Sequence, residues 1–387
     1  IEGSYTWFVL EKRGLDSLTA IRIIARRLGV SEKRFSIAGL KDARAVTFQL
    51  ACVEEVEPNA LKDLKINEKI KIHEAFKAPF KLTTGMLYGN KFEVVVRETY
   101  YASSICEEKI RIIGEELQRA GGAPNYYGYQ RFGTIRPITH ILGKYILLGE
   151  FKQAVETLLY ETFPLESDAA KKARKILAYH KDVTEALEAF PRRLHHERRI
   201  LNYLAKHPGD YIGSIRALPL SIRRLFVGAY QAYLFNLMLS RRMSMELPLN
   251  KAVPGDLVAL NCAQRHVIRV NQANLEKINE WIRQNKACIV IPVPGYNTML
   301  GNGTPSTIIR DVLREENVSL ELFRCKHMPE AASKGTFRPV LLKPENLKYI
   351  IKEEGSVYFT FVLRKGMYAT VLLREYLKPS NPETQGF

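Results

Sequence analysis

The sequence predicts an α+β protein in which strands and helices mix at both ends of the chain and helices dominate the middle. Short runs of alternating apolar residues near each terminus indicate strands with one buried face. Between about residues 151 and 207 strand-like runs are scarce and long helical stretches with scattered charge prevail. No internal repeat or low-complexity linker is visible, so a nested insertion is favoured over two consecutive domains.

The N-terminal elements follow from apolar spacing and from the residues that stop helices. They are a strand at Tyr5–Leu10, a helix from Asp16 or Ser17 to Gly29, a strand at Val46–Cys52 and a strand from Phe92 to Arg97. In the strand at Val46–Cys52, the apolar residues Val46, Phe48, Leu50 and Cys52 are expected to form the buried face. The opposite face is more polar.

The later elements begin with the helix-rich stretch. The predicted helices and strands are helices at Phe151–Tyr160, Ala169–His180 and Phe226–Arg242, strands at Leu257–Leu260, Cys288–Val293 and Ser356–Leu363, and a final helix at Tyr368–Leu377. The basic segment Pro191–Arg199 is expected to be one solvated helix. Turn residues Arg364-Lys365-Gly366 join the last strand to the last helix.

Composition limits the function classes. The chain has 387 residues and a formal charge of +17, so a polyanionic partner such as nucleic acid is one candidate. Its five cysteines are dispersed and form no C-x-x-C pair, which is typical of a reduced, cytoplasmic protein. No run of about 18 apolar residues and no signal-like opening appears, so no membrane association is expected.

The first candidate site is the loop Ala38–Asp42, which precedes the strand at Val46–Cys52. Asp42 lies in a short loop at the rim of a sheet, where rigid neighbours can hold a carboxylate. The adjacent ammonium of Lys41 favours an ionised carboxylate, as a nucleophile or base requires. An ordinary polar turn explains the same residues, so this segment alone does not decide the function.

The second candidate site is the segment Asn125–Gly133, which mixes four aromatic residues with amides, glycines and Arg131. Such a loop can stack a base on an aromatic ring, read its edge with an amide and bind phosphate through arginine. An aromatic packing loop is the structural alternative. Near the C-terminus, Tyr368 is either a packing or a stacking residue.

Several common chemistries lack their sequence patterns. Gly301-Asn302-Gly303-Thr304 is not followed by the lysine of a phosphate-binding loop, and no H-x-x-x-H or H-E-x-x-H spacing occurs. The dinucleotide fingerprint and the G-x-S-x-G motif are also missing. We therefore expect neither a metal nor a nucleotide cofactor.

Six ordered segments together resemble the pseudouridine synthases of the bacterial TruD type and their archaeal and eukaryotic relatives, and the archaeal branch is the most similar. They are Gly39–Gln49, Asn125–Gly133, Arg136-Pro137 with Thr139–Lys144, Tyr230–Asn236, Ser333–Pro339, and Lys365–Thr370 with Leu373-Arg374-Glu375. The resemblance extends over nearly the whole chain. It implies a mixed-sheet catalytic domain built from both chain ends, residues 1–150 and 336–387, around a large α/β insertion domain, residues 151–335.

The resemblance also implies roles for particular residues. Asp42 would be the catalytic aspartate, Lys41 and Gln49 would set its surroundings, and Asn125 and Tyr127 would hold a flipped base. Asp42 is expected to face Tyr127 across a cleft between the catalytic domain and the insertion. Tyr127 replaces the phenylalanine that is common in the family.

The implied substrate is transfer RNA, typically the uridine at position 13, and no obligate protein partner is visible. Isomerisation of uridine needs no external reagent, in agreement with the missing cofactor motifs. The implied activity requires an extruded base, which costs a few kcal/mol. A non-catalytic RNA-binding or RNA-chaperone protein on the same fold is the alternative function.

Two departures from the family pattern are visible. Family members usually carry a further strand and charged residues before the strand at Tyr5–Leu10, so we expect that residues upstream are missing. Met86 replaces a frequent histidine in the turn Gly85–Asn90.

Overall fold

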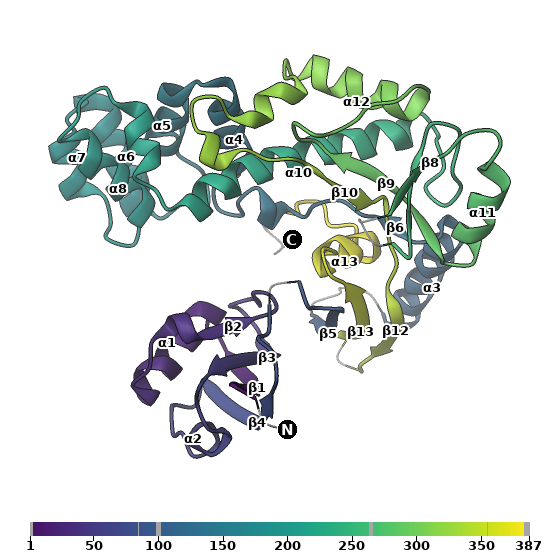
Figure 1. Cartoon of the computed structure of the whole chain (residues 1–387), viewed down its shortest axis with the longest axis horizontal. Coiled ribbons are helices and arrows are strands. Elements are labelled where there is room, and N and C mark those ends of the chain that lie inside the picture. Colours follow the sequence, from purple (N-terminus) through teal and green to yellow (C-terminus); the bar gives the residue numbers. More distant parts are fainter. Residues whose placement is uncertain (1–2, 84, 98–101, 263–265, 354, 383–387) are drawn as a thin grey trace. The chain divides into compact units, whose positions relative to one another are not determined.

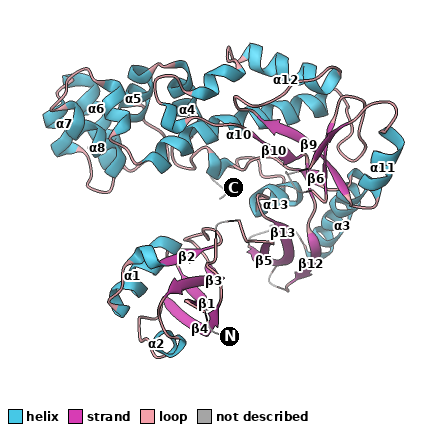
Figure 2. Ribbon diagram, in the orientation of Figure 1, coloured by secondary structure: helices cyan, strands magenta, loops and turns pink. Residues whose placement is uncertain are grey.

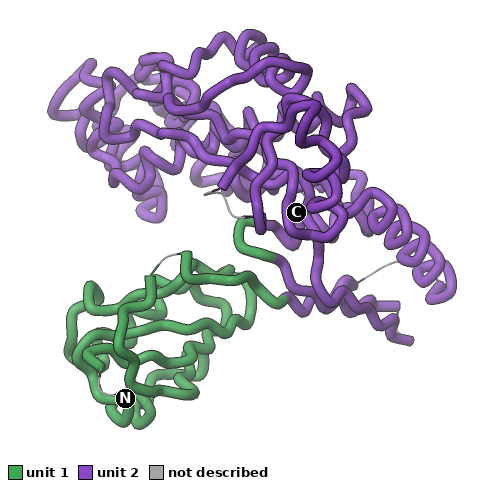
Figure 3. Tube along the Cα trace, turned by 45° about the vertical axis from the view of Figure 1, so that its right-hand side comes forward, with its two compact units in different colours: residues 1–91, 364–366 green, residues 92–363, 367–387 purple. Residues whose placement is uncertain are grey.

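The computed structural model describes residues 3–83, 85–97, 102–262, 266–353 and 355–382. It divides into two compact units: unit 1, residues 1–91 with 364–366, and unit 2, residues 92–363 with 367–387 (Figure 3). Helices and strands are mixed in both units (Figures 1 and 2). The α+β class predicted from the sequence is therefore confirmed.

Unit 1 is a four-stranded antiparallel sheet with the order β2-β3-β1-β4. Its elements are β1 (Tyr5–Arg13), α1 (Ser17–Leu28), a 3-10 turn at Glu32–Arg34, β2 (Phe35–Ile37), β3 (Val46–Glu54), α2 (Pro58–Lys62) and β4 (Ile70–Ala78). Helix α1 begins where Asp16 accepts a hydrogen bond from the amide of Thr19, and ends at Gly29 with φ 67°. Its apolar side packs with Phe8, Leu10 and Ala51 of the sheet.

Over most of β3 the buried face is the reverse of the one expected from its apolar residues, although Cys52 is buried as expected. Val46 and Phe48 are more than half exposed, at 54% and 58%, whereas Gln49 and Ala51 are buried. The cause is the register with β1, in which Gln49 pairs with Leu10, so that the face of β3 next to α1 carries Gln49. A polar residue tolerates this position because it lies beside Ser17 at the end of the core.

The described residues of unit 2 form three small sheets surrounded by helices. The sheets have the orders β10-β9-β7-β8, β11-β6 and β12-β13-β5. The strands are β5 (Gly89–Val96), which begins in unit 1, β6 (Ala123–Pro124), β7 (Leu257–Leu260), β8 (Val267–Arg269), β9 (Ala287–Val293), β10 (Thr336–Pro339), β11 (Leu341–Leu342), β12 (Glu345–Ile351) and β13 (Val357–Arg364). The helices are α3 (Ser103–Ala120), α4 (Thr139–Leu148), α5 (Phe151–Tyr160), α6 (Asp168–His180), α7 (Val183–Ala189), α8 (His195–Leu204), α9 (Tyr211–Arg216), α10 (Leu220–Ser244), α11 (Leu275–Arg283), α12 (Thr304–Glu315) and α13 (Ala369–Leu377).

The long helix α10 is the main packing element of unit 2 and contacts α4, α12 and β9 (Figure 1). Helix α4 approaches it so closely at Gly143 that a Cβ atom there would clash with the backbone carbonyl of Phe226. Ala232, Leu234 and Phe235 of α10 are fully buried. This helix therefore joins the helical half of the unit to the β7–β10 sheet.

A buried ionic network fixes the helices around α5. The Arg174 side chain is fully buried and its guanidinium lies 2.9 Å from Glu166 and 2.8 Å from Glu197. Arg136 contacts the same two carboxylates at 3.5 and 3.2 Å. Burial and the neighbouring Arg174 lower the pKa of Arg136 to about 10, against the attraction of the carboxylates. Two cations thus face two anions in a region largely without solvent.

Most elements lie where the sequence predicts them, with shifted ends. Helix α5 and strand β7 have the predicted bounds, while α10 is longer at both ends. The segment 191–199 was expected to form one helix, but α8 begins only at His195, and Arg198 is partly buried because its guanidinium donates to the carbonyl of Phe190 at 2.7 Å. The three-part domain division stays a prediction, because compact units describe packing and not an insertion.

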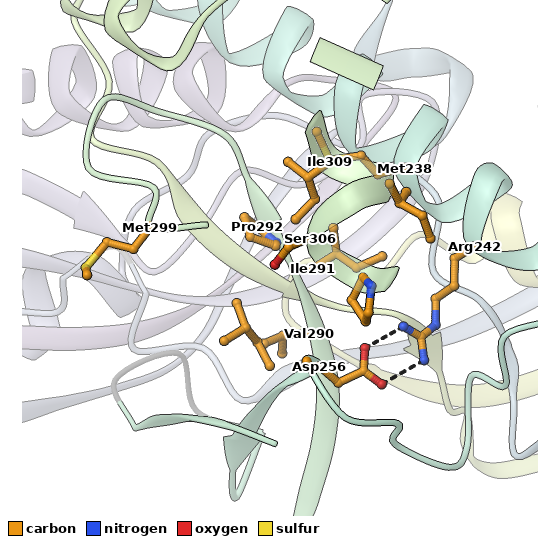
Figure 4. A pocket seen from close by; sticks show the side chains of 13 residues that line it. Met238, Arg242, Asp256, Val290, Ile291, Pro292, Met299, Ser306 and Ile309 are labelled. Carbon is orange, nitrogen blue, oxygen red and sulfur yellow. Dashed lines mark hydrogen bonds and ion pairs between the residues drawn. The ribbon is translucent and has the colours of Figure 1, made fainter. Parts of the chain in front are cut away.

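One small pocket lies between α10, β9 and α12 (Figure 4). Its volume is about 20 Å³, enough for about one water molecule. Arg242 and Asp256 border it as a bidentate pair at 2.6 and 3.0 Å, and both are buried. The lining is otherwise mainly apolar, so this pocket is best explained as part of the packing between α10 and the sheet.

No disulfide bond joins the cysteines within the described residues. In the part of the chain that the structure describes, no helix is long and apolar enough to cross a membrane.

Candidate functional site

The loop that carries Asp42 joins β2 to β3 in unit 1, and its backbone is held by side chains from β1 and α1. The ammonium of Lys12 donates to the backbone carbonyl of Asp42 at 2.6 Å. One residue earlier, the backbone amide of Lys41 donates to the hydroxyl of Ser17 at 3.1 Å. The Asp42 side chain is exposed. The backbone is therefore fixed while the carboxylate remains accessible.

Lys41 is held by its side chain as well. Its ammonium donates to the side-chain oxygen of Asn90, at the start of β5. Burial lowers the pKa of Lys41, the negative charge of Asp42 raises it, and the nearby Lys12 lowers it further. Two lysines and one carboxylate thus influence one another at this loop.

Lys12 is fully buried at the end of β1, which is unusual for a lysine. Burial lowers its pKa, and Asp42 and Asp16 act in the opposite direction. A buried ammonium is costly unless it is hydrogen-bonded. The carbonyl of Asp42 supplies that partner, which explains how a lysine can be buried at the second-to-last position of the strand.

Two polar atoms beside Lys12 have no hydrogen-bond partner among the described residues: the Gln49 Nε2 amide and the Thr47 hydroxyl. Thr47 pairs with Lys12 across the β1–β3 ladder. The carbonyl oxygen of Gln49 accepts from Ser17 at 3.3 Å. The underside of the Asp42 loop therefore has free hydrogen-bonding capacity, which a water molecule could use.

The second candidate site is a cluster in unit 2 that we call the aromatic–arginine cluster: Asn125, Tyr127, Arg131, Arg338 and Tyr368. Arg338, from β10, is 5% exposed and its guanidinium lies 3.9 Å from the centre of the Tyr127 ring. It donates to the backbone carbonyl of Asn125 at 2.9 Å and to its side-chain oxygen at 2.8 Å. Burial lowers the pKa of Arg338, and the phenol of Tyr127 opposes this shift. The arginine therefore links the segment that starts at Asn125 to the last strand of the β7–β10 sheet.

Asn125 is buried and both polar atoms of its amide are engaged within the protein. The nitrogen donates to the carbonyl of Pro339 at 2.9 Å, and the oxygen accepts from Arg338. In this arrangement the residue positions the chain before Tyr127. Its predicted contact with a base stays a prediction.

Tyr127 is held at its backbone by Asn236 of α10. The Tyr127 amide donates to Asn236 at 2.8 Å, and the Asn236 amide donates back to the Tyr127 carbonyl at 3.0 Å. Its ring meets Phe235 and Tyr368 edge to face, with centroids 5.6 and 6.2 Å away. The ring is thus fixed in orientation but only partly buried.

The guanidinium of Arg131 lies 6.0 Å from the Tyr127 ring centre. Its Nε atom is buried and has no hydrogen-bond partner among the described residues. Burial raises the pKa of Tyr368, while Arg131 and Arg338 lower it. Two guanidinium groups therefore converge on two tyrosine rings, an arrangement suited to an aromatic or anionic group.

The predicted site residues thus form two groups. Lys41, Asp42 and Gln49 belong to unit 1, and Asn125, Tyr127, Arg131 and Tyr368 belong to unit 2. The expectation that Asp42 faces Tyr127 stays a prediction. Within the described residues, no group of three His, Cys, Asp or Glu side chains could hold a metal ion.

Comparison with known proteins decides the family. The family model described as tRNA pseudouridine synthase D (TruD) matches residues 1–376. The chain belongs to the TruD family. The resemblance predicted from its motifs and the enzyme class of that family, the isomerases that form pseudouridine in RNA, are thereby confirmed.

Relatives of this TruD-family chain include archaeal proteins of similar length. A protein of Methanopyrus kandleri named "Probable tRNA pseudouridine synthase D" is 41% identical over 97% of this chain and 86% of its own. One of the same name from Pyrococcus abyssi is 37% identical, with 97% and 91% covered. A crystal structure described as the Methanosarcina mazei TruD protein matches with a TM-score of 0.82 at 36% identity, over 98% of this chain and 89% of that one.

Sequence reasoning missed three residues that shape these groups in the TruD-family chain: Lys12, Asn236 and Arg338. Asn236 and Arg338 are polar residues with apolar neighbours, and Asn236 lies one turn after Ala232 on a buried helix. Lys12 lies between Glu11 and Arg13, near the end of the strand that begins at Tyr5. A buried polar residue requires a partner, and that requirement is the signal that could have found them.

Proposed function

We propose that this chain converts a uridine of tRNA to pseudouridine, with Asp42 as the catalytic carboxylate. Family membership supports the reaction and the curated relatives' names support the substrate. The observation that carries the assignment to Asp42 is the fixed backbone beneath an exposed carboxylate. Lys12 and Ser17 hold the backbone on either side of the peptide bond between Lys41 and Asp42, through the Asp42 carbonyl and the Lys41 amide.

That arrangement is what a reaction at a carboxylate requires. Catalytic groups must be held within about 0.5 Å of their productive position by packed and hydrogen-bonded neighbours. The reaction breaks the bond from C1′ to N1, forms a bond from C1′ to C5, releases the C5 hydrogen as a proton and adds a proton at N1. Attack on the sugar, attack on the base and proton abstraction all need the ionised form of Asp42.

The aromatic–arginine cluster supports the handling of an extruded base. A flipped base needs an aromatic or apolar surface to replace the stacking that it loses. Tyr127 has a fixed ring, and the nearby Arg131 can meet a phosphate or stack on the base. We propose that Tyr127, Arg131 and Tyr368 contact the substrate, and that Asn125 acts mainly by holding Tyr127.

The charge of the chain supports a polyanionic substrate. Lys and Arg exceed Asp and Glu by 58 to 41, so tRNA binding is expected to weaken steeply with salt. Position 13 as the target uridine and a cytoplasmic location stay predictions.

The test is tritium release from an unmodified tRNA transcript that carries C5-tritiated uridine. Asp42→Asn should abolish release and keep tRNA binding within a few-fold of wild type. Asp63→Asn is a matched control, since Asp63 is exposed in the same unit. Release by Asp42→Asn at the wild-type rate would refute the assignment, whereas binding without release by the wild-type chain would favour the non-catalytic alternative.

A further inference from the structure

The outer side of α6 carries an exposed basic and aromatic surface. Lys172, Lys175 and Tyr179 are all exposed, and their spacing of three and four residues places them on one side of the helix. Tyr179 is 85% exposed, the highest value among the exposed large hydrophobic residues. These residues line one open hollow together with Asp168, Lys171, Ile176 and His180. We call this surface the α6 face.

The lysines of the α6 face lack the acidic partners that other helices provide. On four other helices of unit 2, exposed cations pair with carboxylates three or four residues away. These pairs are Arg111 with Glu108 and Glu115, Lys152 with Glu156, Arg283 with Glu280, and Arg314 with Asp311. Neither Lys172 nor Lys175 forms an ion pair with a described residue, although Asp168 lies one turn before Lys172. The positive charge of the α6 face is therefore available to a partner.

The surrounding structure keeps the α6 face rigid. The opposite side of the helix carries Arg174, which is fully buried in the ionic network, and Leu177. Ser167 caps its first turn by accepting from the amide of Ala170 and also contacts Arg193. The side chains of the α6 face therefore project from a fixed helix. Within unit 2, this helix lies at the end opposite α11 (Figure 1).

We propose that the α6 face binds the sugar-phosphate backbone of the substrate RNA, with Tyr179 stacking on an exposed base. Lysines supply phosphate contacts that do not depend on sequence, and an exposed tyrosine ring can stack on any base. An acidic protein would use the lysines but gives no comparable reason for a tyrosine ring that is 85% exposed. The inference rests on the proposed function, because it concerns a second contact with the same RNA.

The test measures the affinity of the full chain for a fluorescently labelled, unmodified tRNA transcript as a function of salt. The double variant Lys172→Gln/Lys175→Gln should lower the slope of log K against log salt by about 0.9 for each lost phosphate contact, or about 1.8 in total. A charge-matched control is Lys251→Gln/Lys286→Gln, which removes two exposed lysines outside the α6 face. The control should leave the slope within about 0.5 of wild type.

The role of Tyr179 is tested separately. Tyr179→Ala should weaken tRNA binding about fivefold or more, and Tyr179→Phe should keep it, because stacking needs the ring and not the hydroxyl. An unchanged slope in the lysine variant, or an equal decrease in the control, would overturn the proposal. So would wild-type affinity in Tyr179→Ala.

The same samples separate this inference from the proposed function. If wild type releases tritium while the α6 variants bind tRNA normally, only the inference fails. If wild type binds tRNA through the α6 face and releases no tritium, the proposed function fails and the inference stands. Because all substituted residues are exposed, the thermal midpoints of the variants should match wild type.

Discussion

Lys12 offers a substitution for which catalysis and stability are expected to respond differently. In Lys12→Met the side chain keeps a similar length, but the hydrogen bond of 2.6 Å to the Asp42 carbonyl is lost. A bond from a charged donor contributes about 1.5–3 kcal/mol, and this loss is offset because a buried cation no longer has to be desolvated. We therefore expect the free energy of unfolding to change by no more than about 1 kcal/mol.

The loop that carries Asp42 would lose one of its two anchors. A displacement of about 1 Å in a catalytic group lowers turnover by about 100-fold, which corresponds to about 2.7 kcal/mol in the barrier. The assay is single-turnover tritium release, together with urea unfolding followed by circular dichroism. Lys65→Met, an exposed lysine of the same unit, is the control. Turnover within twofold of wild type, or a loss of turnover accompanied by several kcal/mol of lost stability, would refute a positioning role for Lys12.

Three further predictions concern unit 2. Arg338→Met leaves the buried carbonyl and side-chain oxygen of Asn125 without their donor. It should therefore lower the free energy of unfolding by about 2–4 kcal/mol and reduce tritium release. A urea unfolding midpoint equal to that of the wild type would contradict this prediction. Arg174→Ala leaves two buried carboxylates with one cation and should cost about 3–5 kcal/mol by the same measurement, while Arg111→Ala, on the exposed side of α3, should change little. Burial lowers the pKa of His140 from 6.5, so at mildly acidic pH the unfolded chain binds a proton that the folded chain does not. The free energy of unfolding should therefore fall as the pH drops from about 7 to 5, and His140→Phe should reduce this dependence. Equal slopes of unfolding free energy against pH for both proteins would exclude His140 as the source.

The sequence predicted the elements of this fold better than their buried faces. Apolar periodicity located α1, α5 and β7 because these elements are short and bounded by residues that stop them. Apolar periodicity predicted the wrong face for most of β3. The apolar side chains of Val46, Phe48 and Leu50 are exposed, whereas the other face of the strand packs against the core under α1. The choice between two faces depends on the register with β1 and on the position of α1, which the sequence of β3 alone does not contain.

The candidate site shows the same limit. Motifs marked Asp42 and Tyr127, since a loop carboxylate and an aromatic segment are visible as patterns. Asn125 was expected to read a base, yet its amide is used by Arg338 and Pro339, from a strand about 210 residues later. Partners so distant in sequence are brought together only by tertiary folding, so single-sequence reasoning could not assign them.

The membership of residues 364–366 in unit 1 has a consequence for how the protein is made. Arg364 lies over the ring of Tyr88 at 3.7 Å, and the Lys365 amide donates to the carbonyl of Tyr88 at 3.2 Å. The Lys365 ammonium also donates to the carbonyl of Gly85, 280 residues earlier in the chain. At a synthesis rate of about 5–20 residues per second, Lys365 is synthesised about 14–56 s after Gly85, whose carbonyl it contacts. During that interval the turn leading to Asn90, which contacts Lys41, lacks the contacts of Arg364 and Lys365, so the surroundings of the Asp42 loop are completed only after these late residues are synthesised.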